Sequence, residues 1–253
     1  MPLRIASSED QQAWLQLQES VRGRDLGRSV QVLRAWIRNE GWRFMPSNLY
    51  DKYADHVFDR RFGTDTKTVT ELAELHIDSP NKTLGERYQA SPSRPFRRVI
   101  SLLDIDYQEF AFVDFGSGRG RTLLLASSFP FRKVVGVEFS GELHRSAEAN
   151  IAKFFKDSPR DVRSVHCDAS LYELPPDKLV LYFFNPFSDE VLVRVLDNVA
   201  ESVRRNPRRV LLVFLYLPNP ELIEGRAGFD LRAKWHRFHV FEYRPDGTGR
   251  ASE

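Results

Sequence analysis

The pattern of hydrophobic and polar positions becomes regular after about residue 96. From there, short apolar runs alternate with segments whose apolar residues recur at helical spacing. The apolar runs cover residues 110–115, 134–137, 162–167, 179–184 and 210–217. Continuous apolar strands that alternate with helices are typical of a parallel sheet covered on both faces. Residues 231–243 predict two final strands joined by a short turn, so we expect a mostly parallel, seven-stranded α/β sheet.

Two of the intervening helices carry start signals. Ser140 precedes an apolar stripe over residues 143–154, and Ser188 precedes a stripe over residues 191–203. A serine directly before a helix accepts hydrogen bonds from the free N–H groups of the first turn. We therefore expect both serines to act as helix caps.

The chain before the regular region divides into two further parts. Residues 1–57 show apolar residues near helical spacing and predict an N-terminal helical extension. Residues 58–95 are punctuated by glycine and proline and predict a loop-rich lid or linker with one short helix over 69–75. Pro95 suits the first position of a helix that leads into the third part, the ligand-binding domain over residues 96–253.

Composition narrows the classes of partner. The 37 basic and 35 acidic residues nearly cancel, so no whole-molecule field favours a nucleic acid or a membrane surface. The single cysteine, Cys167, excludes an internal disulfide framework, and no His or Cys spacing suggests a metal site. Residues 1–20 hold no apolar signal-peptide core, and the longest apolar run is too short to span a membrane. We therefore expect a cytoplasmic protein without a membrane segment.

Glycines gather where the first strand of the domain ends. Glycine is needed where the backbone takes a positive φ or must approach a ligand closely. A dinucleotide-binding loop would place its third glycine at position 121, where this chain has Arg121. Here the third glycine comes one residue earlier, at Gly120. That spacing is typical of S-adenosylmethionine sites, although a purely structural strand-to-helix turn could use the same glycines. The candidate cofactor-binding residues of this loop are Asp114, Gly116, Ser117, Gly118 and Gly120.

The next two strands end in further polar residues. Glu138, followed by Phe139, ends the second strand about twenty residues beyond the loop, where an acidic side chain can accept hydrogen bonds from both ribose hydroxyls. After the third strand, the carboxylate of Asp168 can accept the adenine amino group, while Cys167 or Ala169 presents its backbone to the ring. The alternatives are that Glu138 is a solvated strand end and that Asp168 caps the next helix.

Together with the sequence Phe-Phe-Asn-Pro-Phe over residues 183–187, these residues resemble motifs I to IV of class I S-adenosylmethionine-dependent methyltransferases. The resemblance covers about residues 88–217 and is strongest to an uncharacterised bacterial group whose motif I reads Gly-Ser-Gly-x-Gly-Arg. It implies a Rossmann-like methyltransferase fold with S-adenosyl-L-methionine as cofactor. Residues 58–66 and 88–92 resemble upstream segments of that group, which lie over the methionine end of the cofactor. Tyr88 is therefore a candidate lid contact, or else a tyrosine packed in a structural turn.

The resemblance implies in-line transfer of the sulfonium methyl group to a nucleophile. In related nitrogen methylases, the asparagine of motif IV and the following carbonyl accept hydrogen bonds from the acceptor amine, and the aromatic residue packs on it. Asn185, Pro186 and Phe187 are thus the candidate catalytic residues, with Asn185 also near the cofactor. The chain has one proline where the motif usually has two, so this segment could instead be a turn that ends a strand. Arg119 and Arg121 flank the glycine loop and could meet the cofactor carboxylate or the substrate.

The acceptor itself is not identified by the sequence. We favour a nitrogen of a protein lysine or a small amine, and we expect a nucleic-acid base least, because the chain shows neither a strong net charge nor an aromatic and basic platform. A catalytically inactive cofactor-binding module is the main alternative, and an NAD-dependent oxidoreductase would need the glycine that position 121 lacks. The oligomeric state is not predicted.

Overall fold

The computed structural model describes residues 57–71, 75, 88–235 and 237–244, all within one unit of the chain, Ala54–Glu253. The expected N-terminal helical extension, residues 1–57, lies outside the described residues except for Val57, which is helical together with residues 58–62. The three domain boundaries therefore stay predictions. Among the helices that the structure describes, none is both long and apolar enough to cross a membrane.

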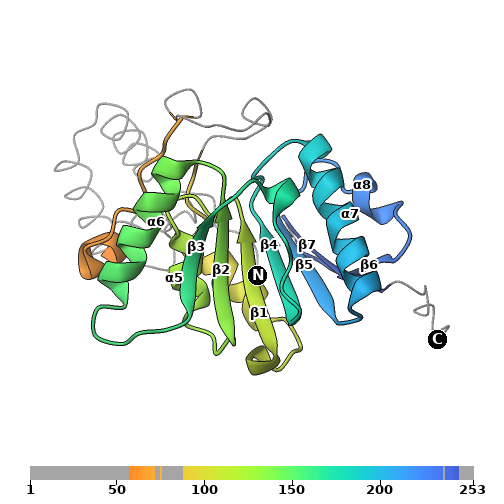
Figure 1. The fold of residues 1–253 in the computed structure, drawn as a ribbon, viewed down its shortest axis with the longest axis horizontal. Helices are drawn as coiled ribbons and strands as arrows, with labels where there is room; N and C mark the ends of the chain where they lie inside the picture. Colours follow the sequence, from red (N-terminus) through yellow and green to blue (C-terminus); the bar gives the residue numbers. More distant parts are fainter. Residues whose placement is uncertain (1–56, 72–74, 76–87, 236, 245–253) are drawn as a thin grey trace, which may run out of the picture. The chain divides into compact units, whose positions relative to one another are not determined.

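A seven-stranded sheet forms the centre of the described residues (Figure 1). Its order is β3-β2-β1-β4-β5-β7-β6, with β1 to β5 parallel and β7 antiparallel to both of its neighbours. The expected Rossmann-like α/β fold with a mostly parallel seven-stranded sheet is confirmed. The strands are β1 Phe110–Phe115, β2 Lys133–Glu138, β3 Val162–His166, β4 Lys178–Phe183, β5 Val210–Leu215, β6 Phe229–Trp235 and β7 Phe238–Tyr243.

Helices cover both faces of the sheet, which explains why the central strands are apolar along their whole length (Figure 1). One face is covered by α4 Ser93–Ser101, α5 Arg121–Ala126 and α6 Gly141–Phe154. There Phe96 of α4 packs edge-on against Phe112 and Tyr182. On the other, α7 Asp189–Arg205 and α8 Glu221–Glu224 pack on a row of rings that are in register on β1, β4 and β5. In that row Phe183 stacks on Phe115 at 5.2 Å and on Phe214 at 4.5 Å. The row fixes the strands whose ends carry the candidate motifs.

The helix starts agree only partly with the expected caps. Ser140 Oγ accepts a hydrogen bond from the Leu143 N–H at 3.4 Å, so its predicted role as the cap of α6 is confirmed. Helix α7 begins after Ser188 as predicted, but the Ser188 side chain makes no capping hydrogen bond. Its hydroxyl is buried without a partner among the described residues, so the predicted capping contact is wrong. Asp189 and Glu190 still place negative charge in the first turn of α7, which the helix dipole favours.

Two predictions for the upstream segment are wrong. Residues 69–71 are not helical, because the Thr70 backbone pairs with Tyr88 in an isolated antiparallel bridge, with N···O distances of 3.3 and 3.0 Å. Leu75, the last residue of the predicted helix over 69–75, is not helical either, and residues 72–74 lie outside the described residues. Helix α4 begins at Ser93, so Pro95 is its third residue rather than its first. Proline is tolerated there because the N–H groups of a first turn have no intrahelical partner.

Candidate active site

A hollow opens at the carboxyl ends of β1 to β4, where ligands bind in open α/β sheets. It encloses about 830 Å³ of empty space, part of it open solvent, and its described lining residues lie between positions 75 and 191. Gly118 and Gly120 do not belong to the lining. The structure thus brings together most, but not all, of the candidate residues. The candidates that line the hollow are Tyr88, Asp114, Gly116, Ser117, Glu138, Phe139, Cys167, Asp168, Ala169, Asn185, Pro186 and Phe187.

The glycine loop connects β1 to α5 and needs its glycines for two reasons. Gly116, Gly118 and Gly120 have φ values of 76°, 52° and 82°, which side chains disfavour. A Cβ atom on Gly116 would also lie 2.4 Å from Pro186 Cβ, and one on Gly118 would lie 2.0 Å from the Tyr88 ring. Gly120 serves as the left-handed N-cap of α5 and faces α6. The three glycines therefore let Pro186, Tyr88 and α6 approach the loop.

Glu138 ties this loop to the end of β2. Its Oε2 atom accepts the Gly118 N–H at 2.8 Å, its Oε1 atom accepts the Ser140 N–H at 2.9 Å, and the residue is only 3% exposed. A carboxylate has about four acceptor positions, so these two bonds leave capacity for donors from a ligand. Glu138 is therefore a buried acceptor at the wall of the hollow and not a solvated strand end.

Two carboxyl groups in the hollow are protonated more easily than usual. Burial raises the pKa of Asp114 to about 8, and the charge of Glu138 raises it further, against a hydrogen bond from the Thr122 side chain. Burial also raises the pKa of Glu138 to about 7, against its backbone hydrogen bonds. Because these pKa values are raised in the folded state, the two groups favour folding below the unfolded-state pKa values of about 4. That contribution is lost as the pH rises through about 7 to 8. A cation in the hollow would favour the ionised forms.

The third strand leads into the candidate adenine contacts. Asp168 caps the short 3-10 helix η5, Ala169–Leu171, by accepting hydrogen bonds from the Ser170 N–H at 2.9 Å and hydroxyl at 2.7 Å. Asp168 also lines the hollow, so the capping alternative is observed and does not remove the residue from the site. The Cys167 thiol donates to the Asp168 carbonyl at 3.3 Å, and burial raises the pKa of that thiol.

The candidate catalytic residues, Asn185, Pro186 and Phe187, follow β4 and pack against the glycine loop. Pro186 approaches Gly116 closely, which is possible because Gly116 has no side chain. Asn185 has a φ of 42°, a left-handed conformation that asparagine tolerates better than most residues. Phe187 lies edge-on to Phe183, with ring centroids 6.3 Å apart, and also lines the hollow. The turn therefore holds its polar residue at the same hollow as the glycine loop.

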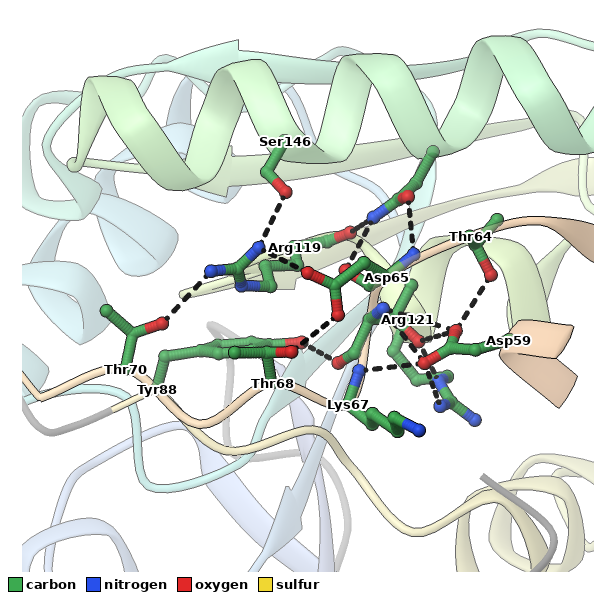
Figure 2. A network of polar contacts seen from close by, with 12 residues as sticks. Asp59, Thr64, Asp65, Lys67, Thr68, Thr70, Tyr88, Arg119, Arg121 and Ser146 are labelled. Atoms are coloured by element: carbon green, nitrogen blue, oxygen red, sulfur yellow. Dashed lines mark hydrogen bonds and ion pairs between the residues drawn. The ribbon is translucent and has the colours of Figure 1, made fainter. Parts of the chain in front are cut away.

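Arg119 and Arg121 both point toward the upstream segment (Figure 2). The sequence had left open whether they meet the cofactor carboxylate or the substrate. Arg121 is only 1% exposed, pairs with Asp59 at 3.6 Å and donates a hydrogen bond to the Thr66 hydroxyl. Arg119 donates to Asp65 at 3.0 Å. These contacts join residues more than fifty positions apart and therefore leave no local pattern in the sequence. The polar residues over 58–66 were the available sign that this segment forms such contacts. The lining also includes Gln89, Thr122 and Leu143, which were not among the sequence-based candidates.

No protein-family model and no curated protein sequence matches the chain. Solved structures similar to it include ribosomal protein L11 methylase from Lactobacillus delbrueckii subsp. bulgaricus, with 15% identity and a TM-score of 0.46, covering 64% of this chain and 81% of that one. They also include an RNA methyltransferase from Salinibacter ruber in complex with S-adenosyl-L-homocysteine (18%, 0.45, covering 61% and 92%). A third is a predicted N6-adenine-specific DNA methylase from Listeria monocytogenes str. 4b F2365 (11%, 0.47, covering 61% and 51%). At these identities the likeness concerns the fold, and the expectation that nucleic acid is not the acceptor gains no support.

Proposed function

We propose that this protein is an S-adenosyl-L-methionine-dependent methyltransferase. The observation that carries the proposal is the convergence of separate sequence motifs on one hollow. The glycine loop after β1, Glu138 at the end of β2, Asp168 after β3 and Asn185 after β4 all meet there. Each polar group stands at the carboxyl end of a parallel strand, where this class of sheet places its ligands.

The charge of the hollow favours a cationic cofactor over a dinucleotide. Three carboxyl groups line it, those of Asp114, Glu138 and Asp168. Arg121 is the arginine among its described lining residues, and Asp59 stands beside it to offset the charge. At neutral pH Asp114, with a pKa of about 8, is mostly protonated and Glu138, with a pKa of about 7, is partly ionised. A bound sulfonium would favour the ionised forms of both groups, whereas the two negative charges of a pyrophosphate would oppose their ionisation. The alternative of an NAD-dependent oxidoreductase is therefore disfavoured by electrostatics as well as by glycine spacing.

The described residues suit the parts of this cofactor. Glu138 has free acceptor capacity for ribose hydroxyls, and Asp168 stands beside Cys167 and Ala169 where an adenine ring could lie. The buried hydroxyl of Ser117 has no partner among the described residues and offers one more polar contact. When bound, the cofactor supplies an activated methyl group. The protein has to orient the two reactants and exclude water, and the site needs no covalent enzyme intermediate.

The direct test is a calorimetric titration of the full chain with S-adenosylhomocysteine, with NAD as the matched control. We expect dissociation constants on the order of micromolar for the first, about −8 kcal/mol, and no measurable heat for NAD. The same titrations after urea unfolding control for nonspecific heat. Binding of NAD in preference to S-adenosylhomocysteine by the folded protein would contradict the proposal.

We further propose nitrogen as the acceptor atom, in a protein lysine or a small amine. Support comes from Asn185, which lines the hollow in the turn after β4, and from the carboxyl groups of the lining, which attract amines. The amide oxygen can accept a hydrogen bond from an acceptor N–H and so orient the nitrogen lone pair. Phe187 offers an apolar surface beside it.

Replacing Asn185 with glycine tests this role, because glycine accommodates the φ of 42° while removing the amide. We expect S-adenosylhomocysteine affinity to change less than about threefold and methyl transfer to fall about 100-fold, as for loss of a positioned polar group. Methyl transfer is measured as the label that passes from S-adenosylmethionine, labelled in its methyl group, to amines or proteins in cell extract. Asn185→Asp, which keeps an acceptor oxygen, should retain more transfer than Asn185→Gly. Absence of labelling by the wild type would instead favour the inactive binding module.

A further inference from the structure

A polar network joins the upstream segment to the glycine loop (Figure 2). We propose that Asp59 is a positioning residue that fixes Tyr88 over the glycine loop and so shapes the part of the site that receives the amino-acid portion of the cofactor. This inference rests on the proposed function, because it concerns the same hollow. Asp59 itself does not line the hollow.

The Asp59 carboxylate organises the segment that follows it. It is 4% exposed and accepts hydrogen bonds from the Thr64 hydroxyl at 2.7 Å, the Thr66 hydroxyl at 2.8 Å and the Lys67 N–H at 3.0 Å. The Thr66 N–H also lies 3.1 Å from one of its oxygens and 3.2 Å from the other. A buried carboxylate is tolerated only when its acceptor positions are used. Asp59 therefore holds residues 64–67 in one conformation.

Arg121 joins this segment to the first turn of α5, directly after the glycine loop. Its guanidinium pairs with Asp59, donates to the Thr66 hydroxyl and packs over the Phe58 ring at 4.5 Å. Arg121 also lines the hollow. Because both partners of the ion pair are buried, removing the charge of one would leave the other uncompensated. The pair thus couples the position of the segment to that of the loop.

Tyr88 carries the coupling from the segment into the hollow. Its hydroxyl donates to the Thr66 carbonyl at 2.6 Å, and its backbone pairs with Thr70. The ring lies so close to Gly118 that a Cβ atom there would be 2.0 Å from a ring carbon. The Gly118 N–H in turn binds Glu138. An unbroken series of contacts therefore runs from Asp59 through Thr66 and Tyr88 to the glycine loop.

The sheet order indicates which part of a ligand this series reaches. Asp168, after β3, is the candidate for adenine, and Glu138, at the end of β2, is the candidate for ribose. The lining that remains for the amino-acid portion comes from β1, from the turn after β4 and from the upstream segment. Asp114 belongs to β1, and Tyr88 and Ser91 belong to the upstream segment. The Tyr88 hydroxyl is occupied by the Thr66 carbonyl, so its ring is the surface available to this end of the site.

The test compares two ligands that differ in this portion. S-adenosylhomocysteine contains the amino-acid group, and 5′-methylthioadenosine lacks it but keeps the nucleoside and sulfur. We expect Asp59→Asn to weaken the first about tenfold or more, because hydrogen bonds to a charged group are lost, and to change the second less than about threefold. The matched control is Asp65→Asn, which removes the same charge from the same segment. Asp65 is half exposed and pairs with Arg119 at the surface, so neither affinity should change more than about twofold.

A milder variant covers the case in which Asp59→Asn does not fold, as judged by circular dichroism. Tyr88→Phe keeps the ring and removes the hydroxyl, with its hydrogen bond to the Thr66 carbonyl and its interaction with the Arg119 backbone. We expect it to weaken S-adenosylhomocysteine binding about threefold to tenfold without affecting 5′-methylthioadenosine. Equal loss of both ligands in a folded variant, or no loss in Tyr88→Phe, would overturn the inference alone. Wild-type protein that binds neither ligand would overturn the proposed function first.

Discussion

Replacing Gly118 with alanine is expected to weaken S-adenosylhomocysteine binding about 100-fold or more, because two costs add at this position. The φ of 52° is left-handed, which costs a residue with a side chain about 1–2 kcal/mol. The new Cβ atom would also lie 2.0 Å from the Tyr88 ring, and such overpacking costs about 1–3 kcal/mol. The ring or the loop must move, and the Gly118 N–H then leaves Glu138. Calorimetric titration measures the loss.

Gly63 offers a matched control for this variant. Its φ is 65°, but a Cβ atom there would meet nothing within 4 Å. Gly63→Ala therefore carries the backbone cost without the clash, and we expect its affinity to stay within about threefold of the wild type. If Gly118→Ala bound S-adenosylhomocysteine as Gly63→Ala does, the close approach of Tyr88 would have no role in cofactor binding.

The second large effect is expected for Glu138→Gln, although the two side chains have nearly the same shape. The carboxylate accepts backbone N–H groups on both oxygens, whereas glutamine would direct its own NH₂ group at one of them. One buried N–H would then be unsatisfied, at about 1–3 kcal/mol, and the ribose hydroxyls would lose an ionised acceptor. We expect affinity for S-adenosylhomocysteine to fall about 100-fold. Glu142→Gln, at an exposed position of α6, is the control and should bind normally.

Glu138 also predicts how binding depends on pH. Its pKa is raised to about 7 by burial, and hydroxyl donors of the ribose favour the ionised form. Wild-type affinity should therefore rise as the pH increases from 6 to 8. The rise should be smaller in Glu138→Gln, where Asp114, with its pKa of about 8, is the remaining buried carboxyl group. An equal pH dependence in both proteins would exclude Glu138 as the group that titrates.

The sheet and the glycine loop could be predicted from the sequence because they leave local signals. Strands covered on both faces need continuous apolar runs, and glycines at positive φ cannot be replaced freely. The contacts of the upstream segment could not be predicted in this way. Thr70 pairs with Tyr88, and Thr66 with Arg121, so tertiary contacts over long separations decide the local structure. The helix predicted over 69–75 was wrong for this reason, since helical spacing of apolar residues says nothing about a distant backbone partner.

Asp168 shows a different limit of sequence reasoning. Helix capping and ligand contact stood as alternatives, yet one carboxylate both caps η5 and lines the hollow. An aspartate has more acceptor positions than a single cap uses, so the two roles are compatible. At Ser188 the residue type and the helix start were predicted, but the direction of the hydroxyl depends on side-chain packing.

The lining of the hollow ends at residue 191, so β5, β6 and β7 contribute none of its described lining residues. These strands still complete the sheet, and all the residues of β5 and β7 are buried. Selection on them is therefore expected to act through packing, which tolerates exchange among apolar residues of similar volume. Selection on the glycine loop acts through backbone conformation, which tolerates almost no exchange. Homologous sequences should therefore vary more in β5 and β7, which contribute stability, than at the loop glycines, which shape the ligand site.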